Sequence, residues 1–280
     1  MAFSSRHDFE SLSITELVLM ANSGNSSAQY TLGMRYSRGD GGVEKDRTAA
    51  TKLWLRAAEA GHADAQYRVA SSLHYSREPD TTNEDMKIAL SWYHKSAASG
   101  HADAAAELAV IYEYGWEAPK DRVAATHWYR VAAEGGDADA QYWIAHLYAY
   151  GDAEVAIEKD ESAALHWYRE AADGGNASAQ CSLGEAYHYG AYGVGVDLAA
   201  AENWYREAIG GGSEDASRGL SELLNCVAED CRAGGAFECG SCRSVRYCSP
   251  ACQMTHWKAH KKHCRAINDR AKLLKKPAAA

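Results

Sequence analysis

Proline and long apolar runs are both scarce in this sequence. Only four prolines occur among 280 residues, beside 24 glycines. Few prolines with many glycines are typical of short helices joined by glycine turns, so we expect a mostly α-helical chain. No stretch approaches the roughly 18 consecutive apolar residues of a membrane span, and the N-terminal segment lacks the basic-then-apolar order of a signal peptide. We therefore expect a soluble intracellular protein without a membrane partner.

Motifs of the common enzyme classes are also missing. The sequence contains no P-loop, no Gly-x-Ser-x-Gly elbow, no His-Glu-x-x-His pair and no dinucleotide-binding fingerprint. We predict that the protein is not an enzyme.

Charge and cysteine divide the sequence near residue 225. Residues 1–225 hold 18 basic and 34 acidic side chains, a net charge of −16, whereas residues 226–280 hold 11 basic and four acidic ones, a net charge of +7. Cys181 lies in the first part, and seven cysteines lie between Cys226 and Cys264. Such asymmetry indicates two modules. The acidic first module would repel nucleic acid and favour basic partners.

Tryptophan recurs through the first module at a nearly fixed period. Trp-Tyr pairs begin at Trp92, Trp128, Trp167 and Trp204, after a Trp-Leu pair at Trp54, with successive spacings of 38, 36, 39 and 37 residues. A period of this length is typical of stacked repeat arrays. The units are Asn25–Gly61, His62–Gly100, His101–Gly136, Asp137–Gly175 and Asn176–Gly212.

Each unit is predicted to form a helical hairpin. A polar first residue and an early acidic or hydroxyl side chain favour a helix start, and apolar residues such as Ala28, Leu32 and Tyr36 then recur at four-residue steps. Second helices are expected to begin near Asp46, Asp85, Asp121, Asp160 and Asp197 and to reach the alanine pairs Ala57-Ala58, Ala97-Ala98, Ala132-Ala133 and Ala171-Ala172. One hairpin cannot bury its apolar face alone, so neighbours must stack.

The repeated order of Ala, Leu-Gly, Tyr, Gly, Asp, Trp-Tyr and Ala-Ala resembles the Sel1-like repeat family. The resemblance covers residues 25–212 and implies an α-hairpin solenoid, related in shape to tetratricopeptide arrays, that binds proteins on its concave face. Residues 1–24 and 213–225 are expected to form single capping helices, because terminal units of such arrays are atypical. The second and fourth units depart from the pattern in their loops, at 76–79 and 152–159.

Three features of the repeats have a structural and a functional interpretation. His127 and His166 share a column with Lys52, Ser91 and Asn203, so we interpret them as surface or groove residues and not as a metal row. The aromatic columns have helical spacing and are interpreted as core. The cysteine of the first module is interpreted as a buried thiol.

Seven cysteines and one histidine are paired at short spacings in residues 226–264. The pairs are Cys226-x4-Cys231, Cys239-x2-Cys242, Cys248-x3-Cys252 and His260-x3-Cys264. Eight such donors fill two tetrahedral zinc shells and leave no position for an activated water. Disulfides are the alternative, but the count is odd and no signal peptide is found. We predict two structural Zn²⁺ ions, which supply folding energy to a module too short to bury a core.

The order of CxxC, Arg-Tyr-Cys, Cys-Gln, Trp, His and Cys from Cys239 to Cys264 resembles the MYND zinc finger, a cross-braced module. The resemblance implies one zinc ion on Cys226, Cys231, Cys248 and Cys252 and the other on Cys239, Cys242, His260 and Cys264. The first pair departs from the CxxC of the family, so Glu229 or water is the alternative donor to Cys226.

The same resemblance implies a surface for proline-containing peptides of partner proteins. Tyr247, Gln253 and Trp257 match the groove positions of the family. An indole offers a flat apolar face to proline, and a glutamine amide can meet an extended peptide backbone. Packing over the zinc shell is the alternative for Trp257, and a polar helix surface is the alternative for Gln253.

Together these features predict a protein–protein interaction adaptor, with a solenoid for one protein and a zinc finger for a second. The alternatives are a ubiquitin-ligase-associated subunit and a nucleic-acid-associated regulator that uses the basic C-terminal module, including a basic tail at residues 265–280. A RING-type ligase would place its histidine within the module and a CxxC last, and this sequence does neither. Reduced zinc-finger thiols predict the cytoplasm or the nucleus.

Overall fold

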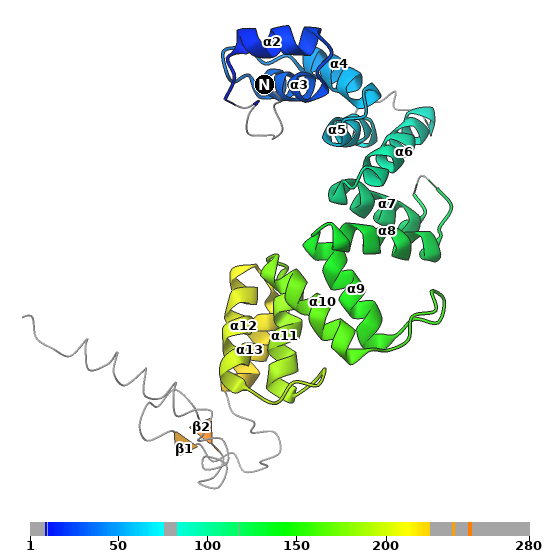
Figure 1. Cartoon of the computed structure of the whole chain (residues 1–280). Helices are drawn as coiled ribbons and strands as arrows, with labels where there is room; N and C mark the ends of the chain where they lie inside the picture. The colour runs from blue at the N-terminus through cyan, green and yellow to red at the C-terminus, as the bar shows by residue number, and fades with distance from the viewer. Residues whose placement is uncertain are drawn as a thin grey trace, which may run out of the picture. The chain divides into compact units, whose positions relative to one another are not determined.

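A computed structural model of the chain describes residues 9, 11–75, 83–116, 118–224, 237–238 and 246–247 (Figure 1). The chain divides into two compact units, Met1–Ala140 and Gln141–Ala280. The described residues form helices apart from two short strands, which confirms the prediction of a mostly α-helical fold. No helix within these ranges combines the length and the apolar character needed to cross a membrane.

In the first unit, the described residues form a lone helix followed by three helical hairpins (Figure 1). The bounds are α2 Ile14–Asn22, α3 Ser26–Arg38, α4 Arg47–Glu59, α5 Ala63–His74, α6 Asn83–Ala98, α7 Ala102–Tyr114 and α8 Arg122–Glu134. Helices that follow one another in sequence pack against one another along the unit. This is the stacking that the tryptophan period predicts.

In the second unit, the described residues continue the alternation, followed by a lone helix and two short strands. The bounds are α9 Ala138–Tyr150, α10 Glu161–Asp173, α11 Ala177–Tyr189, α12 Leu198–Gly210, α13 Glu214–Leu224, β1 Phe237–Glu238 and β2 Arg246–Tyr247. Helix α13 packs on both α11 and α12, as a cap of the array should. The strands pair in antiparallel register, with Phe237 opposite Tyr247.

Side-chain caps fix where most of the helices begin. Asn25 accepts a hydrogen bond from the backbone N–H of Ala28 at 2.8 Å, and Asn176 makes the same contact in the fifth repeat. Asp46 and Asp121 cap second helices in the same way at 2.9 Å. These contacts satisfy N–H groups that have no partner within the helix, so the predicted starts are confirmed at these residues. In the second repeat, α6 begins at Asn83, two residues before the predicted Asp85, which lies in its first turn.

The core of each repeat sets an aromatic ring of the second helix against a small residue of the first. Tyr93 and Tyr205 are fully buried. A Cβ atom added to Gly184 would lie 2.6 Å from Cδ1 of Tyr205, and one added to Gly33 would lie 2.6 Å from Nε1 of Trp54. The equivalent position in the other repeats holds a buried alanine, at 70, 109 and 145. Small residues therefore let the two helices of a hairpin approach closely.

This packing corrects the predicted alignment by one residue in two repeats. Trp54 faces Gly33 as Tyr205 faces Gly184, so Trp54 belongs to the tyrosine column and not to the tryptophan column. In the second repeat, Ala98 is exposed. Ser96 and the alanine that follows it are buried instead, and the Ser96 hydroxyl donates to the Ala63 carbonyl at 2.8 Å. The hydroxyl fits the alanine column because it finds this backbone acceptor.

The structure places both histidines of this column on the surface. His127 and His166 are both exposed. Their rings lie against the neighbouring rings of Trp128 and Trp167, with centroid distances of 4.9 Å and 5.2 Å. They are surface residues that cover part of the indoles.

The glycine at position 184 is expected to be essential for this packing. Gly184→Ala should lower the free energy of unfolding by about 1–3 kcal/mol, because the new methyl group must displace the buried Tyr205 ring. Gly210→Ala is the matched control: its Cβ would meet nothing within 4 Å, and alanine favours a helix by up to about 1 kcal/mol. Urea unfolding followed by circular dichroism measures both variants. Equal stabilities would contradict the close approach.

Candidate functional site

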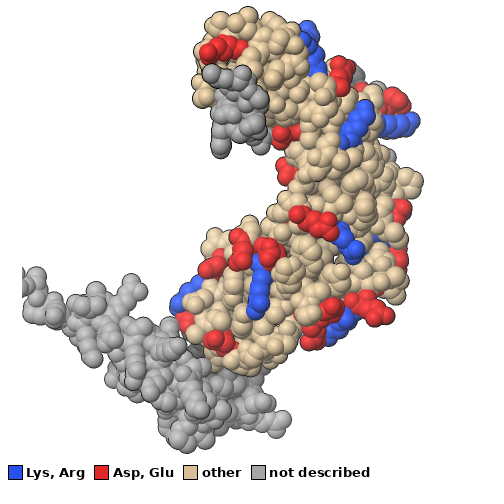
Figure 2. Space-filling view, viewed as in Figure 1, with Lys and Arg blue, Asp and Glu red and all other residues tan. Residues whose placement is uncertain are grey.

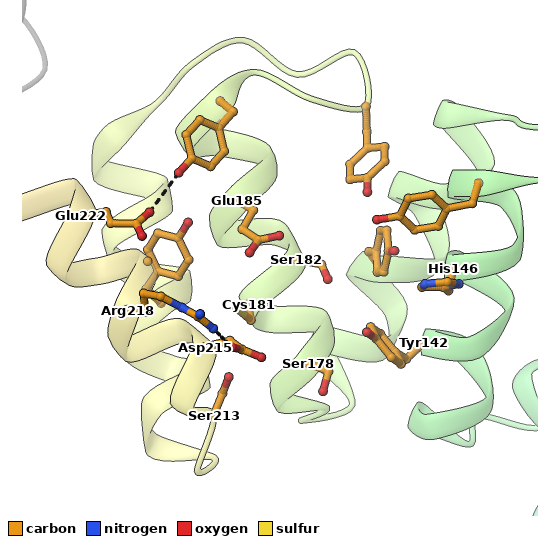
Figure 3. A pocket seen from close by; sticks show the side chains of 16 residues that line it. Tyr142, His146, Ser178, Cys181, Ser182, Glu185, Ser213, Asp215, Arg218 and Glu222 are labelled. Carbon is orange, nitrogen blue, oxygen red and sulfur yellow. Dashed lines mark hydrogen bonds and ion pairs between the residues drawn. The ribbon is translucent and has the colours of Figure 1, made fainter. Parts of the chain in front are cut away.

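A cavity of about 420 Å³ opens among the helices of the second unit (Figure 3). Its walls come from the first helices α9 and α11 and from the terminal helix α13, with further side chains from α10, α12 and the loop after α11. This volume falls in the range of about 300–1,000 Å³ that is usual for ligand pockets. The cavity is therefore large enough for a few residues of an extended chain.

Tyrosine dominates the lining of this cavity. The six tyrosines are Tyr142, Tyr150, Tyr168, Tyr189, Tyr192 and Tyr205. The Tyr168 ring packs against Tyr142 and Tyr192, with centroid distances of 5.9 Å and 5.4 Å. Tyr150 and Tyr189 are 68% and 63% exposed, so most of their surface is open to a ligand, although one face of Tyr189 stacks on the ring of His188 at 4.2 Å. Desolvation raises the pKa values of Tyr168 and Tyr205, which keeps both phenols neutral.

Two glycines from different helices make room for the ring of Tyr205, which lines the cavity. A Cβ atom at either Gly184 of α11 or Gly219 of α13 would lie 2.6 Å from the Tyr205 ring. The ring is thus held in a slot between the two helices, and its hydroxyl oxygen lies 3.4 Å from Nδ1 of His188.

The charged side chains of the cavity are mostly acidic. On α13, Asp215 forms an ion pair with Arg218, and Glu222 accepts a hydrogen bond from the Tyr189 hydroxyl at 3.2 Å (Figure 3). Glu185 projects from α11 into the space between these groups and the tyrosines. Desolvation raises the pKa of Glu185, and the negative charges of Asp215 and Glu222 raise it further, against the opposing effect of Arg218. Acidic charge is therefore in excess in the cavity.

Cys181 lies on the wall of the cavity, but it is only 5% exposed. Burial raises the pKa of its thiol to about 11, and the nearby Glu185 carboxylate contributes in the same direction. The thiol is therefore neutral at physiological pH and is a poor nucleophile. The interpretation of Cys181 as a buried thiol is confirmed.

His146 completes the polar lining. Its ring lies 4.5 Å from the ring of Tyr150, and desolvation lowers the pKa of the imidazole. Within the part of the chain that the structure describes, no group of three or more His, Cys, Asp or Glu residues is placed to hold a metal ion. The cavity offers aromatic faces, hydroxyl groups and carboxylates, which are groups that recognise a cationic or hydrogen-bonding ligand.

Contacts of the same kinds join neighbouring repeats in the first unit. The ring of His101, which precedes α7, stacks on Tyr67 of α5 at 4.7 Å, and its Nε2 lies 3.4 Å from Oδ1 of Asp64. The Tyr75 hydroxyl at the end of α5 donates to Glu107 of α7 at 2.9 Å. Side chains on successive first helices therefore meet across repeats in both units.

Acidic and basic side chains alternate in small groups over the visible face of the described helices (Figure 2). The acidic excess of the repeats is thus distributed over that face. The cavity of the second unit differs because its carboxylates converge on one space.

The sequence-predicted sites fall almost entirely outside the described residues. These are the eight predicted zinc ligands Cys226, Cys231, Cys248, Cys252, Cys239, Cys242, His260 and Cys264, and the predicted groove residues Gln253 and Trp257. Tyr247 is described as part of β2, opposite Phe237. The donor set itself, thiols with one imidazole at paired spacings, fits zinc.

Sequence reasoning missed the cavity, although a signal for it was present. Once the repeats are aligned, four first helices end on a tyrosine or are followed by one, at Tyr75, Tyr114, Tyr150 and Tyr189, and all four are exposed. An aromatic column that is repeated but not buried indicates a recognition surface. The repeat period was used only to assign buried residues, so this exposed tyrosine column was overlooked.

Comparison with known proteins covers both parts of the chain. The family model of the Sel1 repeat matches residues 26–62, 63–101, 102–137, 138–176 and 177–213, and that of the MYND finger matches residues 226–264. Sel1 repeats and MYND fingers are protein-interaction modules, and MYND fingers bind zinc.

Two crystal structures are similar to the repeats. A Sel1 repeat protein from Oxalobacter formigenes is 31% identical with a TM-score of 0.61, over 76% of this chain and 81% of that one. A protective antigen present in uropathogenic Escherichia coli strains, which displays an SLR fold, is 30% identical with a TM-score of 0.64 over 76% of this chain. The match spans 44% of the length of that antigen. This chain therefore belongs to the Sel1 repeat family and carries a MYND finger after its five repeats.

Proposed function

We propose that the protein is a non-enzymatic adaptor, whose repeats bind one protein and whose finger binds a proline-containing peptide of another. The observation that carries this proposal is the cavity of the second unit, where open tyrosine faces and converging carboxylates lie on successive first helices. Such groups hold a ligand through stacking and hydrogen bonds. The joining of two interaction modules in one chain supports a bridging role.

In the finger, we propose two zinc ions with crossed ligand pairs. One ion takes Cys226, Cys231, Cys248 and Cys252, and the other takes Cys239, Cys242, His260 and Cys264. The register of β1 and β2 supports this pairing. Cys239 and Cys242 belong to the segment that connects the two strands, whereas Cys231 precedes β1 and Cys248 follows β2. In an antiparallel hairpin, the connection lies at one end and the outer segments lie at the other.

We further propose five functional segments and a compartment. The segments are 1–24 as an N-terminal cap, 25–212 as the repeats, 213–225 as a C-terminal cap, 226–264 as the finger and 265–280 as a basic tail. Helices α2 and α13, at Ile14–Asn22 and Glu214–Leu224, lie within the two proposed cap segments and support them. Zinc-bound thiolates require reducing conditions, which supports the cytoplasm or the nucleus as the compartment.

Purified protein is expected to contain two equivalents of zinc. Cys239→Ala should lose at least one equivalent, because a tetrahedral shell then lacks one of its donors. Cys181→Ala removes a thiol outside the finger and should keep both ions. Elemental analysis under reducing conditions measures the metal. Wild-type protein with far less than two equivalents, or with the finger cysteines joined as disulfides by mass spectrometry, would contradict the two-ion finger.

Trp257→Ala is expected to keep both zinc ions and to weaken capture of proline-containing peptides by about tenfold or more, because it removes the apolar face that packs against proline. The probe is an array of short peptides with proline, each beside a copy with alanine in its place. Trp116→Ala is the matched control, since Trp116 is an exposed tryptophan of the repeats. Unchanged capture by Trp257→Ala with zinc retained would show that Trp257 only packs over the finger.

A further inference from the structure

Glu185 is an exposed acidic residue that lines the cavity. Asp215 forms an ion pair with Arg218, and Glu222 accepts a hydrogen bond from the Tyr189 hydroxyl. Among the described residues, no hydrogen-bond donor reaches Glu185. Its charge is disfavoured by desolvation and by two neighbouring carboxylates, and one guanidinium, already paired, opposes them. A cationic ligand at this point would supply both the missing donor and the missing charge.

The tyrosines around Glu185 favour the same kind of ligand. The face of an aromatic ring attracts a cation within about 6 Å of its centroid, and a flat guanidinium can also stack on it. Tyr150 and Tyr189 line the same cavity with most of their surface exposed, and Tyr192, which also lines it, packs on Tyr168. Aromatic faces and the Glu185 carboxylate in one cavity match the two parts of an arginine side chain.

We propose that this cavity binds a basic segment of a partner protein, with an arginine side chain that stacks on the tyrosines and donates hydrogen bonds to Glu185. The occupant is an extended peptide and not a folded domain, since the cavity holds only about 420 Å³. Charge complementarity selects it: the repeats are acidic overall, and the cavity carries three carboxylates against one arginine. This inference rests on the proposed protein-binding role of the repeats and specifies the chemistry of the partner.

The primary test compares labelled arginine-rich peptides with identical peptides that contain citrulline, which keeps the shape of arginine but has no charge. Fluorescence anisotropy with the full-length, zinc-loaded chain measures binding. The arginine peptide is expected to bind about tenfold more tightly than the citrulline peptide, and Glu185→Gln should remove about tenfold of its affinity. Glu207→Gln is the matched control, because Glu207 is exposed on α12 and does not line the cavity. Equal binding of the two peptides, or no effect of Glu185→Gln, would overturn the proposal.

Glu185→Gln is suitable for this test because it should not harm the fold. A carboxyl group whose pKa is raised in the folded state makes the protein less stable as the pH rises above its unfolded-state pKa. At pH 7 the neutral amide avoids this effect, so the variant should unfold at or above the wild-type temperature. Thermal unfolding by circular dichroism checks this expectation before binding is compared.

A photo-crosslinking residue in place of Ser182, which lines the cavity, separates this inference from the proposed function. If cross-links to another protein form, and Glu185→Gln or excess arginine peptide reduces them, the inference is supported. If they form but neither change affects them, the arginine proposal fails while protein binding by the repeats stands. If no protein cross-links at the cavity, the proposed role of the repeats fails there. A cross-link to residues 265–280 of the same chain would identify an internal occupant and overturn the proposal of a partner.

Discussion

The close approach of the two helices within a repeat is the contact on which the other features of the repeats depend. A small residue of the first helix faces a large aromatic side chain of the second, as Gly184 faces Tyr205 and Gly33 faces Trp54. Because the ring fills the space that a Cβ would need, the distance between the helices is fixed by van der Waals contact. Each hairpin then presents its outer side chains in a fixed position to the next hairpin, and the same packing recurs between each repeat and its neighbour.

That regularity explains how residues far apart in sequence meet in one cavity. Tyr189 and Glu222 are separated by 33 residues and form a hydrogen bond between consecutive first helices. Tyr75 and Glu107, separated by 32 residues, form the equivalent link in the first unit. Equivalent surface residues of successive repeats therefore lie side by side because the equivalent core residues beneath them pack in the same way. A change of side chain on the outer column therefore alters the surface without altering the packing beneath it.

The sequence predicted the fold well because periodic burial leaves a periodic pattern of residue types. Helix starts at Asn25 and Asp121 were predictable from capping chemistry alone. The one-residue error at Trp54 arose because the first repeat has tryptophan at a position where the other repeats have tyrosine. The sequence alignment therefore matched Trp54 to the tryptophans of the other repeats, although it occupies the tyrosine position. The exposed tyrosine column was a signal for the cavity, but two further features were not predictable: the placement of Glu185 near carboxylates of another helix, and the shape of the space that several helices enclose. Neither is visible in one segment of sequence.

The two modules differ in what stabilises them, and this difference bears on how an adaptor could be controlled. The repeats fold by apolar packing, and their thiol at Cys181 is buried with a pKa near 11, so oxidation has little access to it. A finger of 39 residues is too short to bury a self-sufficient core, so it would depend on its metal and on reduced cysteines. Oxidation or zinc loss would then disable one binding end and leave the other folded. An adaptor built in this way can release one partner while it retains the second.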